Sequence, residues 1–213
     1  MSLRVIAIDG PAGSGKSTVA RQLAVRLGLE YLDTGAMYRS VAFAALLRDL
    51  DPGDSDAIGA LAPNLEIEVT DGAVTVDGVD ASIEIRGPEV TRAVSIIAAN
   101  PAVRAVLRDQ QRRWAEKRGG GVIEGRDIGT VVFPDAELKI YLTADPEARA
   151  ARRAKEVTDL DYETVAADIA RRDAFDQGRD DSPLTEASDA VLIDTTDRTV
   201  DEIVDDVLGR LGG

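Results

Sequence analysis

The chain has 213 residues, 44% of them hydrophobic, and a formal net charge of −14 at pH 7. This length allows one well-packed core with a small additional unit. Cysteine and histidine are absent, which excludes disulfides, thiolate or imidazole metal sites and histidine-based catalysis. The strong negative charge argues against a nucleic-acid polymer as the main partner.

The first predicted element is a short buried strand that leads into a glycine-rich loop and a helix. Val5, Ile6 and Ile8 form a β-branched run typical of a parallel strand. The loop 10–18 fits G-x-x-x-x-G-K-[ST], and apolar residues at helical spacing follow it up to Gly28. Such a loop surrounds a polyphosphate with backbone N–H groups. The expected ATP-binding residues are Gly10, Pro11, Ala12, Gly13, Ser14, Gly15, Lys16, Ser17 and Thr18.

Two side chains of this loop have specific expected roles, and the residue before it has none. Lys16 is expected to reach the β- and γ-phosphates, and the hydroxyl of Ser17 is expected to bind Mg²⁺. Asp9 either supports the loop or simply ends the strand, and the sequence leaves this choice open.

The next segment, up to residue 118, predicts one strand, three helices and a small sheet. Residues 29–39 indicate a strand, a turn at Asp33, Thr34 and Gly35 and the start of a helix, with a break at 51–56. Alternating apolar residues and two Asp-Gly pairs in 65–82 predict an antiparallel meander, which we interpret as an insertion. Residues 88–100 and 101–118 predict two helices, the second capped by Asn100.

The remaining segment alternates strands with helices. Strands are expected at 122–127, after Gly119–Gly121, and at 138–144 and 190–196, and helices at 146–157, 161–173 and after a capping box of Thr199 and Glu202. The pattern predicts an α/β fold, a five-stranded parallel sheet with helices on both faces. Ligands are expected beyond the carboxyl ends of its strands, where 10–18, 33–39 and 124–130 fall.

Several arginines lie beside acids in predicted loops or helix ends near this sheet edge. They are Arg39, Arg126 beside Asp127, and Arg172 and Arg179 around Asp176. Such pairs are often solvated ion pairs of little energetic value. Their positions here favour phosphate binding, for which the arginine fork is well suited.

Four segments together resemble bacterial cytidylate kinases: IAIDGPAGSGKST, YLDTGAMYR, EGRDIGTVVFPDA and RRDAFDQGRDDSPL. The resemblance covers essentially the whole chain, and DTGAMYR with GRDIGTVVFPDA is far more specific than the loop alone. It implies Mg²⁺-assisted transfer of the γ-phosphoryl group of ATP to CMP or dCMP, by a cytoplasmic monomer that acts on small nucleotides without membrane or nucleic-acid partners. Glu124 departs from relatives with Asp at this position, so no metal-binding role rests on it.

The resemblance also implies an organisation for the chain. A single kinase domain would span 1–213, with a monophosphate-binding region at about 33–100, a β insertion at about 65–85 and an arginine-bearing lid at about 146–172. Besides Lys16 and Arg126, the catalytic set would include the lid arginines Arg149, Arg152 and Arg153. The CMP-binding set would be Asp33, Thr34, Gly35, Arg39, Ser95, Arg104, Arg126, Asp127, Arg172, Asp176 and Arg179.

Within this set, the resemblance assigns the cytosine to Ser95, Arg104 and Asp127. A carboxylate accepts from the 4-amino group of cytosine while an arginine donates to N3 and O2. Uracil places a carbonyl where the amino group was and is disfavoured. Arg39 and Arg126 would hold the acceptor phosphate, and Asp176 would accept from sugar hydroxyls.

Three other functions remain as alternatives. The first is a P-loop kinase for another small acceptor, such as UMP, AMP, shikimate or dephospho-coenzyme A, against which the cytosine-reading residues speak. The second is a nucleotide-switched regulator of the GTPase type, which the absence of an N-K-x-D motif disfavours. The third is a non-catalytic nucleotide-binding module, which the intact Lys16 and Ser17 disfavour.

Overall fold

The computed structural model describes residues 3–156, 161–179 and 181–211 of the chain. These residues form two compact units, a first unit of residues 1–30 and 119–213 and a second unit of residues 31–118. Val157, at the end of the helix expected at 146–157, lies outside the described residues. So do residues 158–160 within the expected lid, Asp180, and the first and last two residues of the expected domain 1–213.

The predicted five-stranded parallel sheet is confirmed. Its strand order is β2-β6-β1-β7-β8. The strands are β1 (Arg4–Asp9), β2 (Tyr31–Asp33), β6 (Gly120–Gly125), β7 (Leu138–Thr143) and β8 (Val191–Asp194). In β1 the side chains of Ile6 and Ile8 are fully buried, as the β-branched run predicts. Parallel pairing places Asp9, at the carboxyl end of β1, opposite Gly125 of β6 and Tyr141 of β7.

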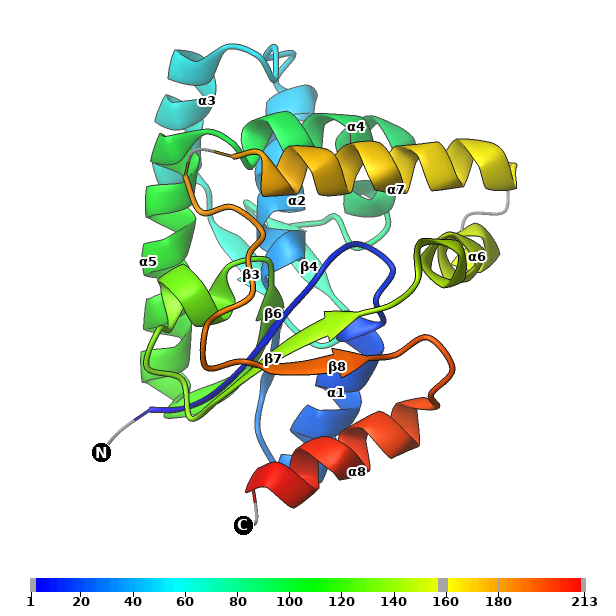
Figure 1. Ribbon diagram of the computed structural model, residues 1–213. Helices are drawn as coiled ribbons and strands as arrows, with labels where there is room; N and C mark the ends of the chain where they lie inside the picture. The colour runs from blue at the N-terminus through cyan, green and yellow to red at the C-terminus, as the bar shows by residue number, and fades with distance from the viewer. Residues whose placement is uncertain (1–2, 157–160, 180, 212–213) are drawn as a thin grey trace. The chain divides into compact units, whose positions relative to one another are not determined.

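Helices of the first unit pack on this sheet and on one another. They are α1 (Lys16–Leu27), α6 (Pro146–Glu156), α7 (Tyr162–Gln177), α8 (Val200–Leu211) and a single π-helical turn, η3 (Ile128–Val132). Helices α1 and α8 lie side by side below the strands in Figure 1, and α6 packs against α7. The capping box of α8 is confirmed, because Thr199 N–H donates to the Glu202 carboxylate (2.8 Å) and Glu202 N–H donates to Thr199 Oγ1 (3.3 Å).

The second unit contains the predicted meander and a set of helices. Its elements, besides β2, are α2 (Thr34–Leu47), α3 (Ser55–Leu61), η1 (Ala62–Asn64), β3 (Ile67–Val69), β4 (Val74–Val76), β5 (Val79–Asp80), η2 (Glu84–Arg86), α4 (Pro88–Ile97) and α5 (Pro101–Arg118). Strands β3, β4 and β5 pair antiparallel, which confirms the meander. Asn100 caps α5, since its Oδ1 accepts from the N–H of Ala102 at 2.9 Å.

Some predicted boundaries were wrong. The expected turn at 33–35 is the first turn of α2, because the Asp33 carboxylate accepts from Ala36 N–H (3.0 Å) and starts the helix at once. The expected break at 51–56 contains the start of α3, capped by Asp54 in the same way. Gly120 belongs to β6 instead of ending the preceding helix. Only glycine fits at this position, because a Cβ on residue 120 would lie 2.1 Å from the Arg4 carbonyl oxygen and clash with it.

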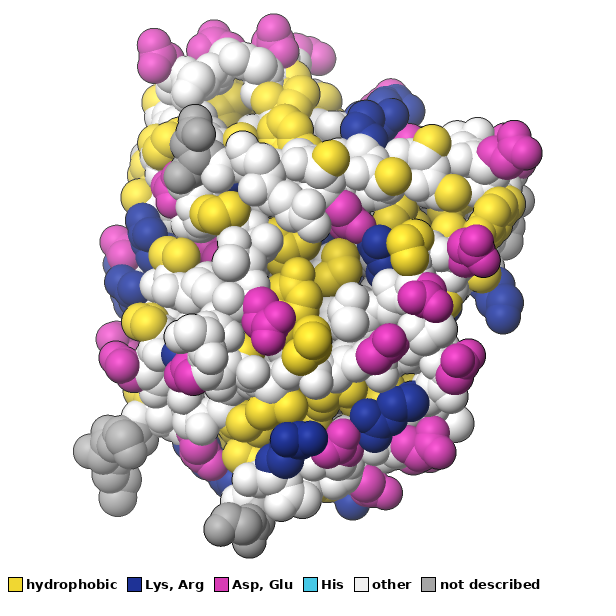
Figure 2. Space-filling model, in the orientation of Figure 1, with side chains coloured by type: hydrophobic (Ala, Val, Ile, Leu, Met, Phe, Trp, Pro, Cys, Tyr) yellow, Lys and Arg dark blue, Asp and Glu magenta, His cyan; other side chains and the backbone are white. Residues whose placement is uncertain are grey.

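Acidic side chains are interspersed with basic ones across the face shown in Figure 2. Among the described residues, no single helix is both long and apolar enough to cross a membrane. Helices α4 and α5 meet the same limits only as a pair, and the pair is bent by 99°.

Candidate active site

The glycine-rich loop joins the buried strand β1 to helix α1, the context that its motif requires. Gly10 has φ 148° and Gly13 has φ 75°. A Cβ on Gly10 would lie 2.1 Å from the Leu142 carbonyl oxygen, so the close approach of loop and β7 requires glycine. Helix α1 begins at Lys16. Its first N–H groups therefore lie at the end of the loop, where they are suited to an anion.

Lys16 is 7% exposed, and its Nζ donates to the Pro11 carbonyl oxygen at 2.7 Å. Burial, together with the positive charges of Arg126 and Arg172, lowers the pKa of Lys16 to about 7, against the opposing effects of Glu124 and Asp9. Charged side chains of the same unit therefore influence the protonation of Lys16. An added phosphate would favour its charged form.

Asp9 braces the segment that follows β6. Its carboxylate accepts from the N–H groups of Ile128 (2.9 Å) and Gly129 (2.7 Å), at the start of η3. Burial raises the pKa of Asp9 to about 6, although these two hydrogen bonds oppose the shift. The structure thus decides the choice that the sequence left open, because Asp9 fixes the backbone next to Arg126 and Asp127 and does more than end a strand.

Three arginines converge on the carboxylate of Asp176, which is only 1% exposed. Arg126 Nε lies 2.9 Å from Oδ2, Arg179 pairs with Oδ1, and Arg172 Nε lies 3.9 Å from Oδ2. Burial alone would raise the pKa of Asp176, but the adjacent Arg126, Arg179 and Arg172 hold it below its ordinary value. The carboxylate therefore organises a half-buried cationic cluster whose guanidinium groups come from the residue after β6, from α7 and from the segment after α7.

Two of the predicted arginines lie inside helices, in agreement with the helices predicted at 161–173 and after the turn at 33–35. Arg172 lies inside α7, which continues to Gln177, and Arg39 lies inside α2. Helix α7 is capped at its start by Asp161, which accepts from Thr164 N–H (2.8 Å), and at its end by Gly178, whose N–H donates to the Ala174 carbonyl oxygen (3.0 Å). Arg126 follows directly after β6, as expected.

The predicted lid arginines Arg149, Arg152 and Arg153 all lie on α6, where Arg149 contacts the phosphate loop directly and Arg152 is linked to it through Thr195. Arg149 donates to the carbonyl oxygens of Ala12 (3.0 Å) and Ala144 (3.1 Å), and it pairs with Asp173. Arg152 donates to Thr195 Oγ1 (2.8 Å), and Thr195 Oγ1 donates to the Ser14 carbonyl oxygen (3.1 Å). The side chain of Arg153 is half-buried.

Asp127 is buried in the first unit, and the remaining predicted CMP-binding residues lie in the second unit. Arg39 Nη1 donates to Thr91 Oγ1 (2.9 Å) and to the Ile85 carbonyl oxygen (3.2 Å). Arg104 is buried, donates to the Ala98 carbonyl oxygen (3.1 Å) and lies over the Tyr38 ring, 5.6 Å from its centroid. Ser95 is half-buried on α4, and Thr34 is buried at the start of α2 beside Gly35.

Sequence reasoning missed two residues that orient the predicted ones, Asp173 beside Arg149 and Thr91 beside Arg39. No local signal was available for either. The bond from Ala12 N–H to Asp173 spans 161 positions of the chain and that from Arg39 to Thr91 spans 52. Only tertiary structure brings such partners together.

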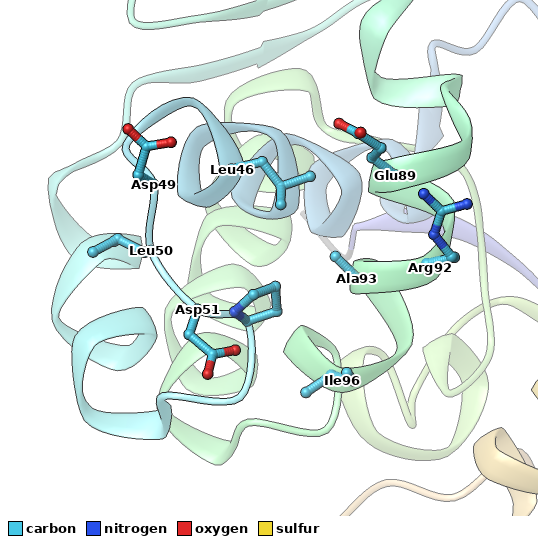
Figure 3. A pocket seen from close by; sticks show the side chains of 9 residues that line it. Leu46, Asp49, Leu50, Asp51, Glu89, Arg92, Ala93 and Ile96 are labelled. Carbon is cyan, nitrogen blue, oxygen red and sulfur yellow. The ribbon is translucent and has the colours of Figure 1, made fainter.

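The structure also contains a hollow in the second unit. It has a volume of about 650 Å³, and Figure 3 shows Leu46 of α2 with Ala93 and Ile96 of α4 around it. The carboxylates of Asp49, Asp51 and Glu89 lie at its margin. No predicted site residue is among those that line it.

The fit of a Mg²⁺ ion depends on Ser17, since the described residues hold no group of three or more acidic, histidine or cysteine side chains suited to a metal. Ser17 is exposed in the first turn of α1. A magnesium ion keeps several waters and binds phosphate oxygens with few protein ligands. A single hydroxyl beside the phosphate loop fits this preference.

A phosphate loop at the carboxyl end of a central parallel strand, with half-buried arginines whose charges act on its lysine, is the arrangement of a P-loop kinase. The fold agrees: a gluconokinase from Sinorhizobium meliloti 1021 superposes with a TM-score of 0.52 at 14% identity, over 98% of this chain and 91% of that one.

Sequence comparison narrows this class. The cytidylate kinase family model matches residues 6–211. A cytidylate kinase of Mycobacterium leprae (strain Br4923) is 50% identical over 94% of this chain and 92% of its own length. One from Streptomyces griseus is 47% identical over 98% and 93%, respectively. The chain belongs to the cytidylate kinase family, and it is an enzyme, a nucleoside monophosphate kinase. The resemblance noted in the sequence is thereby confirmed.

Proposed function

We propose that the protein transfers the γ-phosphoryl group of ATP to CMP and dCMP and so forms CDP and dCDP. The observation that supports this most directly is the arrangement around Lys16. Burial lowers the pKa of this lysine, and the charges of Arg126 and Arg172 act in the same direction, so the phosphate loop and the arginine cluster on Asp176 act on the same region. A donor phosphate and an acceptor phosphate would both find cationic donors there.

The proposed reaction is a direct in-line transfer. An oxygen of the CMP phosphate forms a bond to the γ-phosphorus of ATP, the bond to the β,γ-bridging oxygen breaks, and ADP leaves with that oxygen. The acceptor phosphate is already ionised near neutral pH, so no general base is needed and the absence of histidine is no obstacle. Lys16 and Arg126 stabilise the charge that spreads over the transferring group. A bound Mg²⁺ supplies further charge neutralisation.

The remaining residues are proposed as follows. Arg39, Arg172 and Arg179 hold the acceptor phosphate and its sugar, and Asp176 keeps Arg126 and Arg179 in place. Ser95, Arg104 and Asp127 select the cytosine. Ser17 binds Mg²⁺, and α6 and α7 form the lid. Arg152 and Arg153 approach the donor phosphates, whereas the contacts of Arg149 with Ala12, Ala144 and Asp173 support a positioning role for it. The proposed enzyme is a monomer in the cytoplasm, the compartment that contains ATP and CMP.

The test is ATP consumption with a panel of acceptors: CMP, dCMP, UMP, AMP and shikimate. We expect kcat/KM to be highest for CMP and dCMP. Lys16→Ala should lower kcat by roughly 10²–10³-fold, the cost of removing one preorganised donor from a transition state. Lys117→Ala, which changes an exposed lysine of α5, is the matched control and should keep the wild-type rate.

Two results would reject the proposal. One is a higher kcat/KM for shikimate, AMP or UMP than for CMP, which would assign the site to another acceptor. The other is wild-type turnover by a folded Lys16→Ala protein, which would remove the phosphate loop from the reaction.

A further inference from the structure

Asp173 joins the phosphate loop to both helices of the α6–α7 pair. The side chain of Asp173 is only 10% exposed. One oxygen accepts from the backbone N–H of Ala12 at 3.2 Å, and the other pairs with the guanidinium of Arg149. Both partners are in the first unit, Ala12 in the loop after β1 and Arg149 in the first half of α6. A side chain near the end of α7 is therefore bonded to two other segments.

Arg149 bonds to both Asp173 and the loop residue Ala12. Its Nη1 donates to the Ala12 carbonyl oxygen at 3.0 Å, so Asp173 and Arg149 together satisfy both backbone groups of Ala12. The loop also approaches the α6 backbone closely, because a Cβ on Gly13 would lie 2.9 Å from the Arg149 carbonyl oxygen. Glycine at this position permits that approach.

Apolar packing supports the polar contacts. Ala150 of α6 and Val165 and Ile169 of α7 form a small buried cluster, and the side chain of Ala12 packs against it. Ala12 is thus held by its side chain, its N–H and its carbonyl oxygen. The polar contacts of Arg149 and Asp173 lie near the start of α6 and the end of α7, which we call the base of the pair.

We propose that Asp173 is a positioning residue that anchors the base of the α6–α7 pair to the phosphate loop and thereby fixes the loop in the shape that receives the donor phosphates. The ligand in this statement rests on the proposed function, whereas the anchor itself does not. A buried carboxylate with two donors is matched in charge and in geometry. An amide at the same place has only one acceptor oxygen, so one of the two buried donors would lose its partner.

The test compares Asp173→Asn with Asp168→Asn. Asp168 is on the same helix, but its pair with Arg171 is exposed, so this variant makes the same chemical change without touching the loop. The first measurement is amide hydrogen exchange over residues 10–15 in the nucleotide-free protein. The second is the Kd for Mg·ATP and for CMP by calorimetry.

For Asp173→Asn we expect exchange over residues 10–15 to accelerate roughly tenfold or more, because a buried donor loses its acceptor. The Kd for Mg·ATP should rise by roughly tenfold or more for the same reason, while the Kd for CMP stays within about twofold, as the contacts of Asp173 are all with the donor side. Asp168→Asn should match the wild type in all three. Arg149→Lys provides a second variant that keeps the charge but cannot serve Asp173, Ala12 and Ala144 together, and it should shift exchange and the Kd for Mg·ATP in the same direction.

Unchanged exchange in both folded variants would overturn the anchor. Faster exchange with an unchanged Kd for Mg·ATP would overturn its role in shaping the loop, and equal losses for ATP and CMP would show a general structural effect instead of positioning. If the wild-type protein bound no ATP, the proposed function would fail, and the exchange measurement would still report on the anchor.

Discussion

Lys16 shows how much the chemistry of one side chain depends on its neighbours. A lysine in water is charged throughout the physiological range, but burial and the nearby Arg126 lower the pKa of Lys16 to about 7. The residue type follows from the motif, whereas the shift follows from the packing of the loop. With a pKa near 7, Lys16 is partly neutral at physiological pH, so a bound phosphate can change its protonation.

The first prediction concerns this proton. At pH 8 most Lys16 is neutral, since its pKa is about 7. A bound phosphate favours the charged form and raises the pKa, so binding of Mg·ATP should take up close to one proton, about the fraction that is neutral beforehand. Calorimetry in two buffers of different ionisation enthalpy measures this uptake. Lys16→Met should bind without it, and an equal uptake by both proteins would assign the proton to another group.

The second prediction concerns base selection by Asp127. Asp127→Asn replaces an acceptor with a group that also donates, and its amide can face the O4 of uracil. We expect the ratio of kcat/KM for CMP to that for UMP to narrow by about tenfold, within the range of a good base-edge contact. Steady-state kinetics with CMP, dCMP and UMP provide the measurement. If all three substrates lose the same factor, Asp127 organises Arg126 and does not read the base.

At the scale of an element, the helix that carries a side chain does not by itself fix the orientation of that side chain. Contacts with neighbouring elements also determine it. Helix α2 carries Arg39, but the guanidinium is directed by Thr91 of α4 and by the Ile85 carbonyl oxygen of η2. Helix α7 likewise carries Asp176, whose partners include Arg126 at the end of β6. In both cases the orientation of a candidate site residue depends on a second element.

The third prediction follows from the contact between α4 and α2. Thr91→Val keeps the shape of the side chain and removes the hydroxyl that accepts from Arg39. We expect the KM for CMP to rise about three- to tenfold, the value of one hydrogen bond, with the KM for ATP unchanged. Thr91→Ser keeps the hydroxyl and should behave as wild type. A Thr91→Val protein with an unaltered KM for CMP would show that Arg39 does not need this partner.

On the scale of the whole molecule, ligand binding and stability are coupled. The enzyme carries a net charge of −14, so its anionic substrates depend on local cationic groups that oppose the general repulsion. Any ligand that binds only the folded state stabilises it by mass action. The Tm measured with CMP therefore reports the affinity of the site for CMP without a catalytic assay.

The fourth prediction uses this coupling. CMP at 100 times its Kd should stabilise the protein by about 2.7 kcal/mol, which raises the Tm by roughly 5–11 °C for a chain of this size. Arg126→Ala at the same CMP concentration should show a clearly smaller shift, because one contact with the acceptor phosphate is lost. Cytidine, which has no phosphate, serves as the control. An equal shift in Tm with cytidine and with CMP would show that the phosphate of CMP does not contribute to binding.

The sequence by itself determined the elements whose signals are local. The phosphate loop, the alternation of strands with helices, the meander and the caps at Asn100 and Thr199 are all encoded within a few residues, because backbone hydrogen bonding and side-chain periodicity are short-range. The family resemblance added the candidate site residues. The boundaries at 33–35 and 51–56 were wrong because Asp33 and Asp54, which also suit turns, act here as helix caps.

Only the tertiary structure decided which distant groups meet. Asp9 binds the backbone at Ile128 and Gly129, Asp176 gathers Arg126 with Arg179, and Asp173 joins Ala12 to Arg149. Such partners are separated by up to 161 positions, and a sequence pattern gives the chemical type of each group but not the contact. Burial then sets the charge state, since a carboxylate or a lysine has its ordinary pKa until the fold removes water and supplies neighbours.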